Sequence, residues 1–408
     1  MTRKSTRCKC IVLGQLCKLI PPGLVNDLAK KYGVDKRARK FTPWSHVTAM
    51  LYTHLAHSLS LNDVCDSLLL HSDRLQTIRG AVPPAKNTLS HANSVRDSAM
   101  AKALFYETLD HLRRSFKGFG GRRGDAMPRR FTRAIHVLDS TTVRLVANCM
   151  DWASHRRRKA AAKLHLSLDL QSFLPGFAVI DTARHHDNSH AATLCSLLKR
   201  GEIAVFDKGY NDYEFLHGLT SRGIFWVTRP KDNLKYKRVE KLLAKRKDNI
   251  LSDELIELCD ASTKKKYPEP IRLVRAKVEV DGEMREMSFI TNNREWQPSS
   301  VCDLYKSRWE IEVFFKEIKQ SLQLCDFLGH NQNAIEWQIW TALLLYVLMR
   351  FHAYLNTWQH GFKRLVCMLR CSLWEHNWIE NIMDTCGTAG GRKRMLATPQ
   401  GAYLPGFP

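Results

Sequence analysis

The sequence has no long hydrophobic run, and this absence argues against a protein that spans a membrane. The longest uninterrupted apolar stretch, Ala342–Met349, is far shorter than the ~20 residues that a membrane helix needs. The N-terminal segment is basic, but Gly14, Gln15 and Lys18 interrupt its apolar residues. We therefore expect no secretory signal peptide and a soluble, cytoplasmic protein.

Cysteine pairs with the spacing of a metal site are also missing. Among the 12 cysteines, Cys8, Cys10 and Cys17 form the one tight group, and its spacing is not a usual zinc pattern. Reduced thiols in a cytosolic protein are the expectation. The chain shows no internal repeats.

Acidic residues are scarce relative to basic ones. The 408 residues include 63 Lys and Arg but 40 Asp and Glu, which gives a formal charge of +23 at pH 7. Such an excess favours a polyanionic partner, either nucleic acid or an anionic membrane surface. Hydrophobic residues make up 44% of the chain, which is enough for a folded core in about two or three domains.

Apolar spacing predicts an all-helical N-terminal domain over residues 1–116. Within it, Ser60 is expected to cap a helix over 61–70. Residues 117–133 are rich in Gly and Arg and predict a flexible basic linker. This linker is either a solvated loop or a hinge that contacts phosphates.

From residue 134 the periodicity changes to that of strands alternating with helices, which is typical of a mixed α/β sheet. This pattern predicts a domain over 134–380 and a flexible tail over 381–408. Two strand-like runs joined by Asp281-Gly282 predict a hairpin, so a β element is inserted at about 231–298. The remaining predicted elements are strands at 134–146, 164–170, 177–180, 203–206 and 225–227, and helices at 190–199, 213–219, 300–322 and 334–358.

The predicted helix over 300–322 places four polar side chains on one stripe beside an apolar arc: Tyr305, Arg308, Glu312 and Lys319. Such a stripe is often an exposed ladder of salt bridges. Two further carboxylates argue for a site instead. Asp139 lies inside an apolar strand and Asp207 ends another, although a turn after the strand would also explain Asp207.

Three carboxylates from separate segments can hold Mg²⁺, and two such ions can activate a water or a 3′-hydroxyl for in-line displacement at phosphorus. Together with the charge of +23, the carboxylates indicate phosphodiester chemistry on nucleic acid.

The motif residues resemble those of bacterial insertion-sequence transposases of the DDE type, in the insertion-sequence-four family. The spacing Tyr305-x2-Arg308-x3-Glu312-x6-Lys319 is similar to the Y-R-E-K signature of that family, and the resemblance extends over about residues 11–370. Other segments that resemble the family are Leu138-Asp139-Ser140-Thr141, Phe206-Asp207-Lys208-Gly209-Tyr210, Gln15–Pro21 and Arg39–Thr42. The chain departs from many members at Lys208, where they carry Arg.

The resemblance implies a ribonuclease H-like catalytic domain in which Asp139, Asp207 and Glu312 ligate two Mg²⁺ ions, with Mn²⁺ as a substitute. It also implies that Tyr305, Arg308 and Lys319 hold phosphates near the cleaved transposon end.

The expected partners are double-stranded DNA, as terminal inverted repeats and as target, and a second copy of the chain in a homodimer at the nucleoid. The expected reaction is cut-and-paste transposition, through hairpin ends. The 3′ strand is first nicked at each element end, and the freed 3′-hydroxyl then attacks target DNA. In relatives a Trp stacks on a flipped base; Trp226 and Trp296 are candidates, although a core or surface position explains each as well. Two alternatives stay open: a structure-specific nuclease that forms no strand-transfer products, and a non-catalytic DNA-binding protein.

Overall fold

The computed structural model describes residues 8–36, 38–121, 131–145, 154–156, 159–182, 187–242, 249–280, 282–324 and 327–385. These residues form two compact units. The first contains the described residues of 1–121, 143–161 and 315–398, and the second contains those of 122–142 and 162–314. The helices after residue 315 therefore group with the N-terminal helices, whereas the predicted division placed them in the C-terminal domain.

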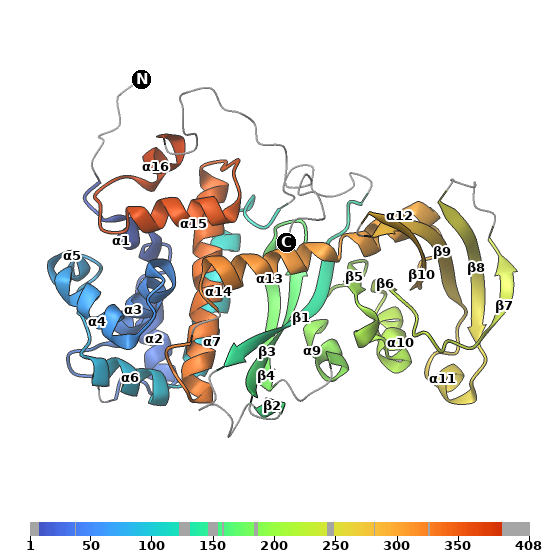
Figure 1. Cartoon of the computed structure of the whole chain (residues 1–408), viewed down its shortest axis with the longest axis horizontal. Coiled ribbons are helices and arrows are strands. Elements are labelled where there is room, and N and C mark those ends of the chain that lie inside the picture. The colour runs from blue at the N-terminus through green and yellow to red at the C-terminus, as the bar shows by residue number, and fades with distance from the viewer. Residues whose placement is uncertain are drawn as a thin grey trace. The chain divides into compact units, whose positions relative to one another are not determined.

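The first unit is mainly helical, as predicted for its N-terminal part. The long helix α14 (Gln332–Leu355) is buried along most of its length, and α7 (Ser98–Ser115) and α3 (Pro43–Ala56) pack against it (Figure 1). The other helices are α1 (Val12–Cys17), α2 (Leu24–Lys31), α4 (Leu61–Leu70), α5 (Ser72–Gln76), α6 (Lys86–Val95), α15 (Phe362–Cys371) and α16 (Ile379–Thr385).

Side-chain caps begin several of these helices. The Ser60 hydroxyl accepts the backbone N–H of Asp63 at 3.2 Å and so starts α4, as the sequence predicted. The Asn331 side chain accepts the N–H of Ala334 at 2.9 Å and starts α14. These bonds satisfy backbone donors that have no partner inside the helix.

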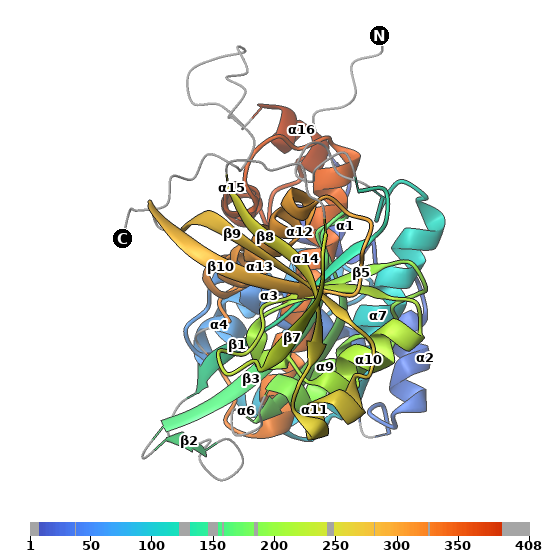
Figure 2. The same ribbon diagram turned by 90° about the vertical axis from the view of Figure 1, so that its right-hand side faces the viewer.

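Most strands of the molecule's ten-stranded sheet belong to the second unit. The strand order is β2-β3-β1-β5-β6-β10-β9-β8-β7, and β4 pairs with β3. Strands β1, β5 and β6 are parallel, whereas β6, β10, β9, β8 and β7 pair antiparallel. The last four lie side by side in Figure 1, and Figure 2 views them from the side that carries β7. The bounds are β1 (Ile135–Leu145), β2 (Ser154–Arg156), β3 (Lys159–Asp169), β4 (Leu174–Thr182), β5 (Ile203–Phe206), β6 (Phe225–Thr228), β7 (Tyr236–Lys241), β8 (Ile250–Leu258), β9 (Ile271–Val280) and β10 (Glu283–Thr291).

Short helices complete the second unit: α9 (Ala191–Leu194), α10 (Tyr213–Ser221), α11 (Ala261–Lys266) and α12 (Pro298–Lys306), with the 3₁₀ turns η2 (Asp187–His190) and η3 (Lys208–Tyr210). Helix α13 (Trp309–Ser321) begins in this unit. The core joins the buried strand β5 to α10 and to β9, through Phe206, Leu216 and Ile271 among others. Every side chain of β5 is buried, which explains its continuous apolar run.

Two predicted helices and one polar stretch differ from the structure. The helix predicted over 190–199 is shortened to α9, and the helix predicted over 300–322 is divided into α12 and α13. The polar stretch 231–266 contains two unpredicted strands, β7 and β8, and the unpredicted helix α11. Strand β7 is an exposed edge, so it carries charged residues rather than the alternating pattern of a half-buried strand.

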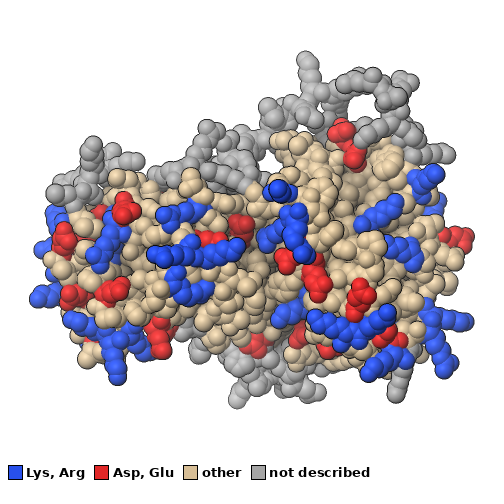
Figure 3. Space-filling model, turned by 180° about the vertical axis from the view of Figure 1, so that it is seen from behind, with Lys and Arg blue, Asp and Glu red and all other residues tan. Residues whose placement is uncertain are grey.

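The predicted linker and tail lie largely outside the described residues. Of the linker, 122–130 are not described, while Phe119 and Phe131 on either side of them are buried. The tail predicted from residue 381 starts inside α16, and residues 386–408 are not described. Among the described residues, no helix is long and apolar enough to cross a membrane. Figure 3 shows basic side chains, interspersed with acidic ones, on one face of the molecule.

Candidate active site

Two parallel strands bring Asp139, inside β1, beside Asp207, which directly follows β5. Strands β1 and β5 pair in parallel with Leu138 opposite Phe206, and each aspartate is the next residue along the chain. The Asp139 carboxylate accepts the N–H of Ser140 at 2.7 Å, and the Asp207 carboxylate accepts the N–H of Lys208 at 2.7 Å. Both carboxylates are therefore held by their own backbone.

The connection between α12 and α13 supplies the other polar groups. At this connection the hydrogen bonds change from four-residue to three-residue spacing: the N–H of Arg308 bonds the carbonyl of Tyr305 at 3.0 Å, and that of Ile311 bonds the carbonyl of Arg308 at 3.2 Å. The Ser307 hydroxyl donates to the carbonyl of Leu304 at 2.6 Å. A serine that bonds back to its own helix favours such a bend, which explains why the predicted single helix is broken.

Despite the break, the side chains of Tyr305, Arg308 and Glu312 meet the aspartates. The Tyr305 ring packs on Phe289 of β10, and its hydroxyl donates to Asp207 at 3.2 Å. The Arg308 guanidinium donates to Asp139 at 3.0 Å and to Glu312 at 2.8 Å. One arginine thus links the strand carboxylate to the helix carboxylate.

The electrostatics of the site follow from this crowding of carboxylates. Burial, supported by the nearby charges of Glu312 and Asp207, raises the pKa of Asp139 to about 6, against the opposing effects of the Ser140 N–H and Arg308. Burial lowers the pKa of Arg308, but the surrounding carboxylates outweigh burial, so it lies above its ordinary value. Burial also raises the pKa of Tyr305 to about 12, which keeps its hydroxyl protonated at neutral pH.

The donor set fits a hard divalent cation in its chemistry, because all three groups offer carboxylate oxygens. In the described part of the chain, however, no three His, Cys, Asp or Glu side chains lie close enough together to hold a metal ion. The Arg308 guanidinium lies between Asp139 and Glu312. Its Nε is buried and bonds to none of the described residues, so this N–H donor is unused.

Lys319 is the one signature residue that lies outside this unit. It lies in the last turn of α13, in the part that belongs to the first unit. The structure therefore groups Tyr305, Arg308 and Glu312 with both aspartates, and leaves Lys319 as a prediction. Lys208 forms an exposed ion pair with Asp232 at 3.0 Å.

The two candidate tryptophans have different surroundings. Trp226 is fully buried on β6 and donates its ring N–H to the Thr220 hydroxyl at 2.9 Å, which is a core position. Trp296 is partly buried, with ring centres 5.9 Å from Phe131 and 5.3 Å from Phe225.

A buried ion pair that was not predicted from the sequence supports the start of α12. Arg272 donates twice to Asp253, at 2.8 Å each, and once to the carbonyl of Trp296 at 2.6 Å. Both charged side chains are 3% exposed. The sequence signal for this pair is Arg272, a charged residue among the apolar residues at the start of β9. The pair fixes the segment that leads into α12 and therefore positions Tyr305.

The structure places two aspartates on neighbouring parallel strands and a glutamate on a following helix, and these are the three carboxylates of the predicted DDE-type site. Residues 130–348 match the family described as Transposase DDE domain. Residues 9–78 match a family described as a domain of unknown function. The chain belongs to the DDE transposase family, in its insertion-sequence-four group.

The relatives are named as transposases. The protein y4zB of Sinorhizobium fredii is 31% identical over 67% of this chain and 73% of its own length. The transposase for insertion sequence element IS5377 of Geobacillus stearothermophilus is 27% identical over 54% and 57%, and that for element IS4 of Escherichia coli is 24% identical over 59% and 51%. The chain therefore spans about half to three quarters of the length of these relatives.

Proposed function

We propose that this chain is the transposase of an insertion sequence, which cleaves DNA at the terminal inverted repeats and joins the freed 3′-hydroxyl to target DNA. The observation that carries the proposal is that Arg308 bonds both Asp139 and Glu312 while the Tyr305 hydroxyl bonds Asp207. Acidic groups beside a buried guanidinium and a phenol offer cation ligands and phosphate donors in one place.

In this proposal Asp139, Asp207 and Glu312 hold two Mg²⁺ ions, for which Mn²⁺ substitutes. When bound, these ions supply Lewis-acid stabilisation of the phosphate and lower the pKa of the attacking hydroxyl. Arg308 has to leave Asp139 and Glu312 before all three carboxylates can take this role. A phosphate oxygen of DNA is a suitable new acceptor for its guanidinium.

Tyr305 and Arg308 orient the cleaved strand. The Tyr305 phenol is neutral at working pH and keeps Asp207 in place while it faces the phosphate. Lys319, in the last turn of α13, is proposed as a third phosphate contact. Contacts of this kind fix the register of the DNA without reading its bases.

The remaining parts of the proposal concern the assembly. We assign DNA-end binding to the helical N-terminal region 1–116 and the basic linker 117–133, and chemistry to a ribonuclease H-like domain over 134–380 with a β insertion at 231–298. Two ends have to be cleaved together, so a homodimer is expected in the DNA complex. Because the substrate is chromosomal DNA, we place the protein at the nucleoid. Hairpin ends are proposed as the intermediate of cut-and-paste excision.

The test uses the purified chain, Mg²⁺ and labelled DNA that carries the inverted repeats of its own element. Wild type should give nicks at the repeat ends, hairpins and strand-transfer products, and Glu312→Gln, Asp139→Asn and Asp207→Asn should bind DNA but give none of them. Cleavage without joined products would favour a structure-specific nuclease. Cleavage that survives all three substitutions would refute the assigned site.

A further inference from the structure

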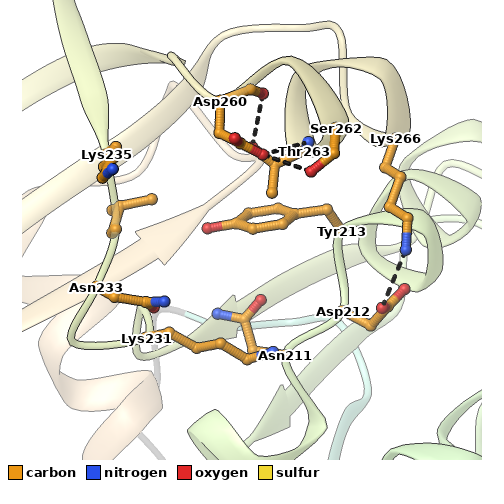
Figure 4. A pocket seen from close by; sticks show the side chains of 11 residues that line it. Asn211, Asp212, Tyr213, Lys231, Asn233, Lys235, Asp260, Ser262, Thr263 and Lys266 are labelled. Carbon is orange, nitrogen blue, oxygen red and sulfur yellow. Dashed lines mark hydrogen bonds and ion pairs between the residues drawn. The ribbon is translucent and has the colours of Figure 1, made fainter.

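A polar pocket of about 430 Å³ lies in the second unit, between the segment after η3 and helix α11 (Figure 4). On its wall Lys266 lies 3.9 Å from the Asp212 carboxylate, which also accepts the N–H groups that begin α10. Asp260 accepts the N–H of Thr263 and begins α11 in the same way. These carboxylates therefore stabilise the starts of two helices, and the described residues that line the pocket do not include those of the candidate active site.

The first unit, in contrast, contains buried polar contacts at the end of helix α13, which carries Glu312. The helix ends at Ser321, nine residues after Glu312. The last carbonyl groups of a helix have no partner inside it. Ser321 and the following Leu322 are both buried, so their carbonyls need partners from the protein. Side chains at the end of α3 lie beside them, and all these residues belong to the first unit.

His54, in the last turn of α3, makes the best defined of these contacts. Its side chain is 1% exposed, and its Nδ1 lies 2.9 Å from the carbonyl oxygen of Leu322. Burial lowers the pKa of His54 to about 4, so the ring is neutral at pH 7 and carries one N–H. Because a carbonyl only accepts, that proton is on Nδ1. The other ring nitrogen lies 3.1 Å from the hydroxyl of Thr341 on α14.

A second histidine, His57, lies at the same end of α3. It caps α3 in the left-handed conformation, with φ at 54°, and its Nε2 lies 2.9 Å from the carbonyl oxygen of Ser321. Arg370 contacts the same nitrogen and donates to the carbonyl of Leu55 at 2.9 Å. Two consecutive carbonyls at the end of α13 thus face two histidines of the N-terminal helical region. The positive charge of Arg370 suits this negative end of the helix dipole.

An ion pair holds α13 about one turn earlier. The Glu317 carboxylate accepts a hydrogen bond from Arg350 of α14 at 2.6 Å, and the two side chains are 11% and 9% exposed. The Arg350 Nε also donates to the Tyr346 hydroxyl at 2.7 Å. This pair joins α13 to α14, whereas His54 joins α13 to the N-terminal region.

We propose that the N-terminal helical region holds the end of α13 through His54 and thereby positions Glu312 for the reaction. The inference rests on the proposed function, in which the Glu312 carboxylate is a metal ligand. A helix rises ~1.5 Å per residue, so the Leu322 carbonyl is about 15 Å along the axis from Glu312. A misplacement of ~1 Å can slow a reaction about a hundredfold. His54 is thus a positioning residue, which acts through the helix and not on the DNA.

The first measurement compares hydrogen exchange of the full-length wild type, His54→Leu and His46→Leu by mass spectrometry. His46 is the matched control, because it is equally buried in α3 but bonds Asn93 of α6 at 2.7 Å rather than α13. Both substitutions should lower the urea midpoint, since each removes a buried imidazole and its hydrogen bonds. Only His54→Leu should speed exchange in peptides from residues 309–321, by about tenfold.

The second measurement is single-turnover cleavage of labelled inverted-repeat DNA with Mg²⁺, under conditions in which every variant is folded. His54→Leu should cleave about ten- to a hundredfold more slowly at unchanged DNA affinity, whereas His46→Leu should cleave at the wild-type rate. His54→Asn should recover most of the rate, because its amide N–H takes about the position of Nδ1 in histidine. If His54→Leu does not fold, Thr341→Val takes its place, and a smaller change in the same direction is expected.

Equal exchange in α13 for His54→Leu and His46→Leu would overturn the proposal. Faster exchange in α13 with an unchanged cleavage rate would also overturn it, because Glu312 would then not depend on the end of the helix. A rate that His54→Asn does not restore would refute the role of the Nδ1 donor. If the wild type cleaves no DNA, the proposed function fails, and the exchange comparison still decides whether His54 holds α13.

Discussion

Replacing Arg308 by Met should strengthen the binding of a divalent cation to the DNA-free protein. The guanidinium bonds Asp139 at 3.0 Å and Glu312 at 2.8 Å, so a cation that uses these carboxylates has to displace it. Two unit charges ~4 Å apart interact by about 4 kcal/mol at an effective dielectric constant of about 20. Moving Arg308 also breaks two charge-assisted hydrogen bonds, each of about 1.5–3 kcal/mol.

Solvation of the displaced guanidinium offsets part of this free energy. We therefore expect Mn²⁺ affinity to rise by at least about tenfold in Arg308→Met, which corresponds to about 1.4 kcal/mol. Free Mn²⁺ is measured by electron paramagnetic resonance at about pH 8, above the value of about 6 to which burial raises the Asp139 pKa. The same variant should cleave DNA poorly, because it lacks a proposed phosphate ligand.

Lys208→Met is the matched control, since it removes a cation that pairs with exposed Asp232 rather than with the three carboxylates. It should leave Mn²⁺ affinity nearly unchanged. Asp207→Asn should weaken Mn²⁺ binding if the ion occupies the proposed site. Equal or weaker Mn²⁺ binding by Arg308→Met would show that the guanidinium does not compete with the cation, and our interpretation of the site would be wrong.

Three further predictions follow from other residues. Burial lowers the pKa of His54 to about 4 in the folded chain. Between about pH 6.5 and pH 4, His54 therefore binds a proton in the unfolded chain but stays neutral in the folded chain. Stability should fall by about 2 kcal/mol between pH 7 and pH 5 from this group, and urea unfolding of His54→Gln should show a smaller loss. Arg272→Met should lower the free energy of unfolding by about 3–5 kcal/mol, and adding Asp253→Leu should restore part of this loss. A loss under about 1 kcal/mol in urea unfolding would contradict the role of the buried pair. EDTA should abolish cleavage but not duplex binding; gel assays that show cleavage in EDTA would exclude a metal-dependent reaction.

The two aspartates could be found from the sequence because their surroundings are unusual for their chemistry. Asp139 interrupts an apolar strand and Asp207 follows a fully buried one, and the parallel pairing of the two strands brings these positions side by side. The strand of residues 203–206 was predicted with its observed bounds, since its continuous burial leaves no polar position.

The bend before Glu312 could not be predicted in the same way. Ideal helical geometry placed Tyr305, Arg308 and Glu312 on one stripe, and the apolar periodicity of 300–322 favours a single helix. The break coincides with three-residue hydrogen bonds and with the bond of Ser307 back to Leu304, which apolar periodicity does not reveal. Strand β7 was missed because an exposed edge has no alternating apolar pattern. Strand β8 lies between β7 and β9, and it was missed because acidic residues interrupt its apolar ones.

The exposed edge strand β7 also limits how copies of this chain can associate. An open edge offers unpaired backbone groups to a strand of another molecule, and this is a common route to aggregation. Along β7 the side chains of Lys237, Arg238 and Lys241 are all exposed. Glu240 is also exposed on this strand, but the edge still carries net positive charge, which disfavours the approach of a second such edge. A polyanion shared between two copies would offset this repulsion.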